Sequence, residues 1–311
     1  MNEELSSMEH EARKFELEQK LGLKAQWENQ VRSLNETGIL ELLPEAADIG
    51  VKGIDGKEHP VPKYEEILAR LTPEKLELLS KKAEQGFTKL LLVPMAASID
   101  VLIDRYKQEI LKKHEAGKLL STDGTPLDLD KETPVYVWDE YKKADADGRI
   151  VYYPKEFSQN HQGKTKQELI NEGDDWEIRL IEDLPDLPAQ GMGQKANEER
   201  GLQTDRIPLE ANHTPREYLQ TTQADPTYQA EDGLTPEGWL TYATTHLHET
   251  DKQIDDYRGK GKLCYLFGSY FPADSRVPCG FWNRGFRQAY LIRFGPDGRL
   301  SINGARPSVK I

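Results

Sequence analysis

The sequence predicts an α+β protein in which a helical N-terminal region precedes a domain of mixed helices and strands. Apolar residues recur at spacings of three and four early in the chain and in two later segments, which is typical of amphipathic helices. Short apolar or alternating runs bounded by Gly and Pro are typical of strands. The 311 residues suffice for one large domain or two ordinary ones, and 37% hydrophobic residues suffice for a core.

Residues 1–80 form the predicted helical N-terminal region. Helical spacing of apolar residues predicts a helix over 3–37, with a break near Gly22. Two shorter helices are predicted over 63–70 and 73–85, the second opened by a Thr-Pro pair that suits an N-cap and first helical position. Sustained heptads are missing, so we expect a packed hairpin or a short oligomerising helix rather than a coiled coil.

Residues 86–311 form the predicted second domain. Phe87–Val93, closed by a proline, reads as its first strand. Helices follow over 98–116 and 236–257, each with one apolar face directed at the core.

Residues 121–234 lie between these two helices and are expected to form a long acidic insertion. Within it, short strands are predicted at 135–138, 150–153 and 177–181. Residues 191–201 lack periodicity and predict a mobile loop. A short helix is predicted from Thr214 to Gln220.

The last 54 residues carry the opposite charge to the rest of the chain. Residues 258–311 hold ten Lys or Arg and two Asp or Glu, a net charge of +8. Because the whole chain carries −13, residues 1–257 carry −21. The tail also concentrates aromatic residues, and aromatics with Arg supply most of the binding energy at protein surfaces. A recognition surface is therefore expected near the C-terminus, unless the tail only neutralises the acidic body.

Motifs for cofactors, metals and covalent catalysis are weak. The Gly163–Thr165 segment lacks the upstream glycine of a phosphate loop, and Asp145–Gly148 has only half of a calcium loop. His246 and His248 point about 200° apart on a helix, so they cannot share one metal ion. Ser269 lacks the second glycine of a nucleophile elbow. We expect no cofactor, no metal and no catalytic residue.

The C-terminal run contains a Trp followed by a spaced series of Arg, Gly and Pro-Asp residues. In order, these are Trp282, Arg284–Gly285, Arg287, Arg293, Pro296-Asp297, Arg299, Gly304 and Arg306. The series resembles the end of C-type lectin-like domains, in the branch shared by formylglycine-generating enzymes and the variable proteins of diversity-generating retroelements. The resemblance lies mainly in residues 262–311. It departs from the family pattern in that Trp282 precedes the Arg-Gly pair.

The resemblance implies a rigid framework that displays a variable surface at about 279–303. The implied framework residues are Trp282, Arg287, Arg293, Pro296, Asp297, Arg299, Gly304 and Arg306. The implied ligand-facing residues are Phe281, Asn283, Arg284, Phe286, Tyr290, Ile292, Phe294, Leu300, Ser301 and Ile302. Aromatic anchors among them suit a protein-binding surface.

The resemblance thus implies a non-enzymatic binding protein whose ligand is a protein or a cell or virion surface. A modifying enzyme of the formylglycine-generating type is one alternative, but its reactive cysteines are expected after Trp282, whereas Cys264 and Cys279 precede it. A nucleic-acid-binding tail is another, which the net charge of −13 disfavours. The N-terminal helices are candidates for self-assembly. No signal-peptide core or membrane-length apolar run is present, so we expect a cytoplasmic protein by default.

Overall fold

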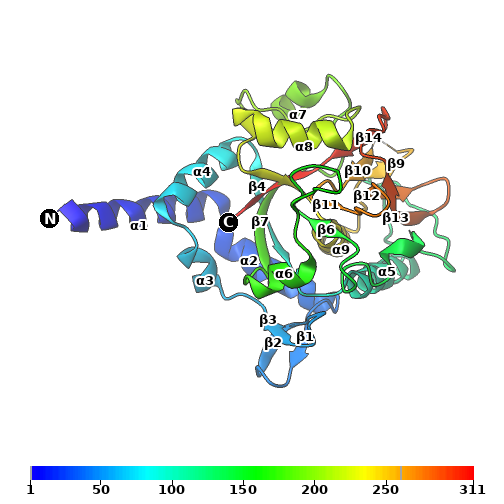
Figure 1. Cartoon of the computed structure of the whole chain (residues 1–311), viewed down its shortest axis with the longest axis horizontal. Helices are drawn as coiled ribbons and strands as arrows, with labels where there is room; N and C mark the ends of the chain where they lie inside the picture. Colours follow the sequence, from blue (N-terminus) through cyan, green and yellow to red (C-terminus); the bar gives the residue numbers. More distant parts are fainter. Residues whose placement is uncertain (1, 260) are drawn as a thin grey trace.

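The structure is a computed structural model that describes residues 2–259 and 261–311, so Met1, the first residue of the predicted N-terminal region, lies outside it. It confirms an α+β architecture (Figure 1). In chain order, the elements are α1 (Asn2–Leu21), α2 (Leu23–Glu36), β1 (Glu41–Leu43), β2 (Asp48–Lys52), β3 (Glu58–Pro60), α3 (Tyr64–Ala69), α4 (Pro73–Glu84), β4 (Phe87–Val93), α5 (Ile99–Glu115), β5 (Val135–Val137), η1 (Asp139–Tyr141), β6 (Val151–Tyr152), α6 (Lys166–Asn171), β7 (Glu177–Glu182), α7 (Gly193–Glu199), α8 (Pro215–Ala224), η2 (Pro226–Tyr228), β8 (Glu231–Gly233), α9 (Pro236–Thr250), β9 (Asp256–Tyr257), β10 (Leu263–Tyr265), β11 (Ser269–Tyr270), β12 (Val277–Asn283), β13 (Gln288–Phe294), β14 (Asn303–Ala305) and β15 (Pro307–Lys310).

Two sheets build the body of the molecule. One is antiparallel, with strand order β4-β7-β15-β8, so the last strand of the chain lies between two earlier ones. The other has the order β14-β10-β12-β13-β5, with β9 beside β12. Its centre is the long antiparallel β12–β13 hairpin, and β5 joins the outer edge of β13 in parallel.

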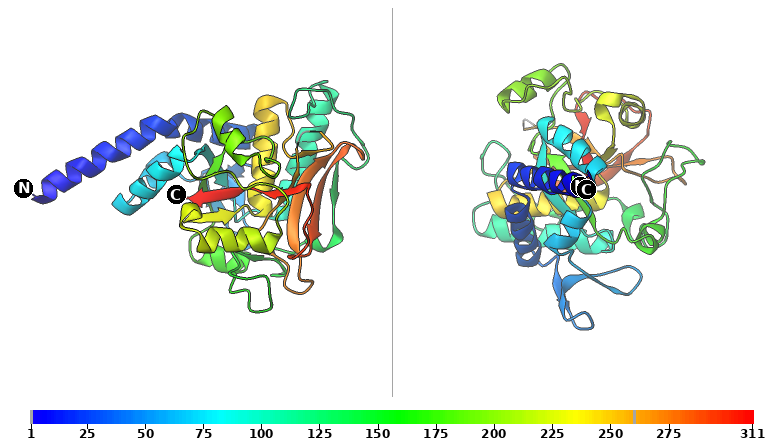
Figure 2. Two further views of the ribbon diagram at one scale, coloured as in Figure 1. Left: turned by 90° about the horizontal axis from the view of Figure 1, so that it is seen from above. Right: turned by 90° about the vertical axis from the view of Figure 1, so that its left-hand side faces the viewer.

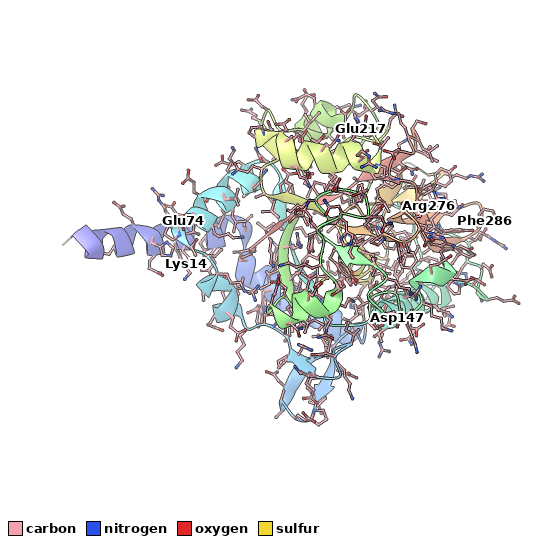
Figure 3. The ribbon with its side chains drawn as sticks, viewed as in Figure 1. Lys14, Glu74, Asp147, Glu217, Arg276 and Phe286 are labelled. Atoms are coloured by element: carbon pink, nitrogen blue, oxygen red, sulfur yellow. The ribbon has the colours of Figure 1, made fainter. Side chains whose placement is uncertain are left out.

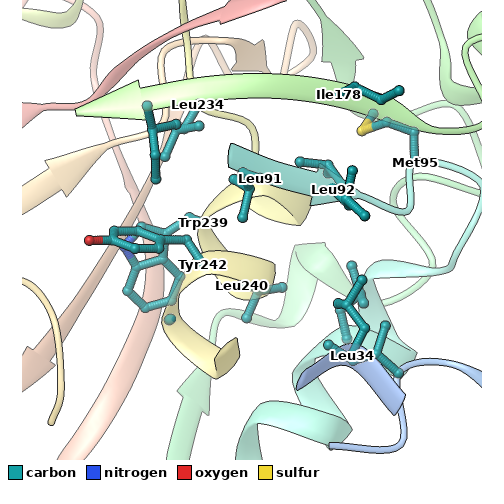
Figure 4. Close-up of a cluster of buried hydrophobic side chains, with 14 of the residues drawn as sticks. Leu34, Leu91, Leu92, Met95, Ile178, Leu234, Trp239, Leu240 and Tyr242 are labelled. Carbon is teal, nitrogen blue, oxygen red and sulfur yellow. The ribbon is translucent and has the colours of Figure 1, made fainter. Parts of the chain in front are cut away.

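Helix α9 lies in the middle of the molecule, in contact with α5, α2, β4 and β12. Most of its residues are buried, including Trp239 and Leu240 (Figure 4), so the prediction of a single apolar face was too narrow. The prediction that this helix continues to residue 257 was also wrong. Asp251 adopts a left-handed conformation (φ 63°) that ends it, and Lys113 Nζ donates to the carbonyl of His248 in the last turn.

The N-terminal region shares one hydrophobic core with the rest of the chain. Leu34 of α2, Ile67 of α3 and Leu79 of α4 belong to the same buried cluster as Leu92 and Trp239. Residues 1–80 therefore do not have a core of their own. They also contain the small sheet β1-β2-β3, for which the sequence analysis predicted no strands. The first part of α1 projects away from the body (Figure 2).

Residues 121–234, expected as an insertion, supply strands to both sheets. β5 pairs with β13, while β7 lies between β4 and β15 and β8 forms an edge. The predicted mobile loop at 191–201 instead contains helix α7. The carboxylate of Glu210 accepts hydrogen bonds from the backbone N–H groups of Gly191 and Gly193, and Asn197 Nδ2 donates to the carbonyl of Arg206. These distant partners stabilise a helix that has no apolar periodicity of its own.

Candidate ligand-binding face

The register of the β12–β13 hairpin places alternate side chains on two different faces of the sheet. Phe281 lies opposite Tyr290, and Cys279 lies opposite Ile292. Because side chains alternate along a strand, these residues share one face, which we call the outer face. Tyr136 of β5 lies beside Tyr290 in the next strand and extends this face.

The inner face of the same sheet is closed by α9. Trp282, Ala289 and Leu291 are fully buried there. At Gly280 a Cβ atom would lie 2.6 Å from the ring of Trp239, so only glycine lets helix and strand approach this closely. The inner face therefore serves packing alone.

Helix α8 covers one end of the outer face. Its residue Tyr218 stacks on Phe267, with ring centroids 6.0 Å apart, and lies 6.4 Å from Tyr265 of β10. The other end, formed by β13 and β5, lies open. There Tyr136 is 42% exposed and Phe286, in the turn after β12, is 61% exposed.

Tyr290 stands at the centre of an aromatic cluster at this open end. Its ring centroid lies 5.0 Å from that of Tyr136, 5.2 Å from Phe281 and 5.9 Å from Phe286. Tyr257 of β9 meets Phe281 edge-on at 5.9 Å. Rings at these separations attract one another and hold each other in place. We call the set Tyr136, Tyr257, Phe281, Phe286, Tyr290, Ile292 and Phe294 the aromatic face.

Exposed cations surround the aromatic face. Arg258, Arg276 and Arg287 are exposed, and no carboxylate among residues 8–259 and 261–311 lies within ion-pair distance of them. The guanidinium of Arg258 lies 5.7 Å from the ring of Tyr257. Figure 3 shows Arg276 and Phe286 at the end of the molecule opposite α1. The site thus combines apolar rings with unneutralised positive charge, an arrangement that favours an acidic binding partner.

Seven of the ten predicted ligand-facing residues are at least partly exposed to solvent. They are Phe286, Tyr290, Ile292, Phe294, Leu300, Ser301 and Ile302. The last three lie in the turn before β14, apart from the aromatic cluster.

The other three predicted ligand-facing residues require a correction. Phe281 is only 3% exposed, because Tyr290 and Tyr257 cover it. Asn283 is buried, and its Oδ1 accepts hydrogen bonds from the backbone N–H groups of Gly285 and Phe286. Arg284 binds the buried carboxylate of Asp256 through Nε at 2.9 Å and Nη2 at 2.6 Å. Phe281 therefore packs beneath the rings of Tyr257 and Tyr290, while Asn283 and Arg284 hold the turn between β12 and β13.

Among the predicted framework residues, Arg306 and Trp282 are the most deeply placed. Arg306 Nη2 and Nε donate to the two carboxylate oxygens of Asp255, at 2.6 and 3.1 Å. The same side chain donates to the carbonyls of Leu184 and Pro185, which fixes an irregular loop. Burial raises the pKa of Asp255, and Arg306 opposes that shift. Trp282 is fully buried.

Four further framework residues hold the edges of the site. Pro296 is buried, and its carbonyl accepts from the N–H of Arg216 in α8. Asp297 accepts from Arg216 Nε at 2.7 Å, and Arg299 donates to Glu217, so both fasten α8 over the sheet. At Gly304 a Cβ atom would lie 3.0 Å from the side chain of Leu187, so that strand packs tightly.

Arg293 and Arg287 behave differently from each other. Arg293 Nη1 donates to Asp274 at 2.6 Å and its Nη2 to Glu140 at 3.1 Å, which holds the edge of β13. Arg287 is exposed at a left-handed turn position (φ 58°), so the expectation that its side chain belongs to the framework needs correction. Only its backbone is engaged, where its carbonyl accepts from the N–H of Asp130.

Sequence reasoning missed four residues of the site: Tyr136, Tyr257, Arg258 and Arg276. The alternating Val-Tyr-Val-Trp segment at 135–138 did predict a strand, but it was assigned to the insertion. Pairing of β5 with β13 brings Tyr136 beside Tyr290 from 154 positions away. Nothing local in the sequence indicates that pairing.

Groups with catalytic potential lie away from the aromatic face or are buried. Cys264 and Cys279 are fully buried free thiols on opposite faces of the sheet, and burial raises the pKa of both. The Ser269 hydroxyl donates to the carbonyl of Leu266. Burial, helped by the positive charge of Lys89, lowers the pKa of His246 to about 3. Thus these groups are protonated thiols, a hydrogen-bonded hydroxyl and a neutral imidazole near pH 7.

Within the described residues, no group of three or more His, Cys, Asp or Glu side chains is arranged to hold a metal ion. No helix in the described part of the chain has the length and apolar character to cross a membrane. No family model, curated protein or solved structure compared with this chain matches it significantly.

Proposed function

We propose that this protein is a non-enzymatic binding protein whose aromatic face contacts a protein ligand. The observation that carries this proposal is the cluster of rings centred on Tyr290, which opens to solvent at Tyr136 and Phe286. Monomeric proteins seldom leave such rings exposed together, and exposed apolar patches mark interaction surfaces. Rigid aromatic side chains also lose little conformational entropy on binding.

The proposed scaffold is a C-type lectin-like domain of the kind found in the variable proteins of diversity-generating retroelements. Three features support it. Helices α5 and α9 pack together, α9 contacts β4 of one sheet and β12 of the other, and the C-terminal strand β15 lies in the sheet that contains the early strand β4. The motif residues Trp282 and Arg306 are buried, whereas the intervening Phe286 is exposed. This division between buried framework and exposed display residues is what a variable surface requires.

Neighbouring side chains hold in place the strands that carry the aromatic rings, and a surface held in this way favours binding. Arg284 and Asn283 fix the turn that presents Phe286, and Arg293 holds β13 through two carboxylates. A preorganised surface loses less entropy when a partner docks, so more of its contact energy is available as affinity.

Photo-crosslinking with a variant series tests this proposal. A photoreactive amino acid at position 286 is expected to capture a protein ligand that the same amino acid at Leu42 does not, since Leu42 is 73% exposed on the distant strand β1. The double variant Phe286→Ser/Tyr290→Ser is then expected to weaken binding of that ligand by roughly 100-fold, as loss of two anchor residues does. Leu42→Ser serves as the matched control and should bind normally.

The opposite results would contradict the proposal. If the double variant keeps its affinity while Leu42→Ser also binds normally, the aromatic face is not the binding surface. Thermal melting of both variants shows whether the fold has been kept.

We also propose that α1 docks or assembles the protein. Met8 and Phe15 are 72% and 61% exposed on this projecting helix, whereas Leu17 and Leu21 are buried. Removal of residues 1–80 would strip part of the shared core, so the double variant Met8→Lys/Phe15→Lys is the cleaner test. Light scattering should show a smaller particle for this variant than for the parent protein. Equal masses for a multimeric parent and its variant would refute assembly through this helix.

A further inference from the structure

A hollow lies at the edge of the aromatic face, where β5 and β13 run side by side. It has a volume of about 330 Å³ and is lined by Tyr136, Trp138, Arg276, Ile292 and Arg293. This volume falls within the range of small-ligand pockets, roughly 300–1,000 Å³. The hollow therefore has room for one or two side chains of a partner.

Three of the five side chains that line the hollow are aromatic or aliphatic, namely Tyr136, Trp138 and Ile292, and the two aromatic ones are held in place. Trp138 packs edge-on against Phe271, with ring centroids 6.3 Å apart, and the Arg293 guanidinium lies against its ring. Tyr136 is held by its contact with Tyr290. An aliphatic or aromatic side chain that enters the hollow would therefore meet preformed apolar surfaces and displace water from them.

The two arginines of the hollow differ in how their charges are balanced. Arg293 donates to Asp274 Oδ2 and Glu140 Oε1, at 2.6 and 3.1 Å, so its charge is already paired. Arg276 is exposed and has no carboxylate within ion-pair distance in the part of the chain that the structure describes. One guanidinium with free donors thus stands beside the apolar walls, and carboxylates are its best-matched partners.

We propose that this hollow is a subsite for an acidic residue of the protein ligand and an apolar residue next to it. The acidic side chain binds Arg276, and the apolar side chain lies between Tyr136 and Trp138. The inference rests on the proposed function, because it names the chemistry of the partner that the aromatic face binds.

A nucleotide is the competing occupant, because arginine and aromatic rings also bind phosphates and bases. The charges around the hollow disfavour it. Glu140 and Asp274 stand at its edge, and the chain as a whole carries −13, which repels a polyanion. A single carboxylate meets much less of this repulsion.

Titration of the full-length protein with N-acetyl-aspartyl-leucine amide tests the subsite, with the indole N–H signal of Trp138 observed by NMR. Saturable binding is expected. Arg276→Gln should weaken it roughly tenfold, as loss of a charge-assisted hydrogen bond does. Arg13→Gln is the matched control, since Arg13 is also exposed and carries the same charge but lies on α1, outside the hollow and the aromatic face. The control variant should bind the peptide as the parent does.

Three results would overturn the subsite: equal peptide affinity of Arg276→Gln and the parent, equal binding of the neutral N-acetyl-asparaginyl-leucine amide, or tighter binding of adenosine monophosphate than of the acidic peptide. These results leave the proposed function standing if Phe286→Ser/Tyr290→Ser still weakens binding of the protein ligand. Conversely, peptide binding that depends on Arg276 keeps the subsite even if that double variant binds the protein ligand normally.

Discussion

Replacement of Arg306 by Ala is expected to destabilise the protein severely. Arg306 is 4% exposed and its partner Asp255 is fully buried. The substitution removes both hydrogen bonds to the Asp255 carboxylate and leaves that carboxylate with one remaining side-chain donor, Trp239 Nε1 at 2.9 Å. It also leaves the carbonyl of Leu184 without its donor, and the carbonyl of Pro185 with only the backbone N–H of Asp255. A buried carboxylate that loses its counterion must stay charged at high cost or take up a proton.

The expected loss follows from the buried charge pair. Removal of one partner of a buried ion pair costs about 3–5 kcal/mol of unfolding free energy. An unfolding entropy of about 2.1 cal/mol/K per residue gives roughly 650 cal/mol/K for this chain, so each kcal/mol lowers the melting temperature by about 1.5 °C. The Arg306→Ala variant should therefore melt about 5–8 °C below the parent.

Thermal melting followed by circular dichroism, with Arg299→Ala as the matched control, provides the assay. Arg299 lies in the same segment, but its ion pair with Glu217 is at the surface, and such pairs contribute about 0–1 kcal/mol. Arg299→Ala should melt within about 2 °C of the parent. If Arg306→Ala melts as high as Arg299→Ala, Arg306 does not hold the framework and the reasoning is refuted.

Three further predictions concern the interior. Cys264 and Cys279 should react with iodoacetamide at pH 7 only after the protein is unfolded in urea, because burial raises the pKa of both thiols; fast labelling of the native protein would contradict this. His246 has a folded-state pKa of about 3 against an ordinary 6.5, so the unfolded chain binds more protons and its contribution to stability falls as the pH drops below 6.5. Between pH 7 and pH 5 the parent should lose about 2 kcal/mol more unfolding free energy than His246→Phe, as measured by urea denaturation, and parallel losses would refute the assignment. Gly280→Ala should cost about 1–3 kcal/mol, because its Cβ would overlap the indole ring beneath it, whereas Gly298→Ala, with 3.4 Å to its nearest neighbour, should melt with the parent; equal melting of the two would contradict the tight packing.

The positions of the long helices could be predicted from the sequence because their signals are local. Ser98 accepts a hydrogen bond from the N–H of Asp100 at the start of α5, and Thr72, Thr214 and Thr235 cap α4, α8 and α9 in the same way. A cap and the apolar spacing behind it lie within a few residues of each other, so both can be read along the chain. Helix α7 had no such local signal, since its support comes from the distant residue Glu210.

The ends and faces of elements were less predictable. Nothing in the spacing of apolar residues after Leu247 indicates that Asp251 turns left-handed and ends α9. Likewise, the alternation in β12 correctly separates the side of Phe281 from the side of Trp282, but it does not indicate that both sides are covered. Exposure depends on what packs against a strand, and for Phe281 that is Tyr257 and Tyr290.

By itself, the sequence determined an α+β protein, the location of its long helices and of strand β4, and a basic, aromatic C-terminal segment. Only the tertiary structure decided that β5 joins β13, that α8 covers one end of the outer face, and that Tyr136 and Arg276 complete the aromatic site at the other end. The physical reason is range. Helix periodicity, caps and strand alternation depend on neighbours in sequence. Burial, ion pairing and strand order depend on residues that the fold brings together from farther along the chain, 51 positions for Asp255 and Arg306 and 154 for Tyr136 and Tyr290.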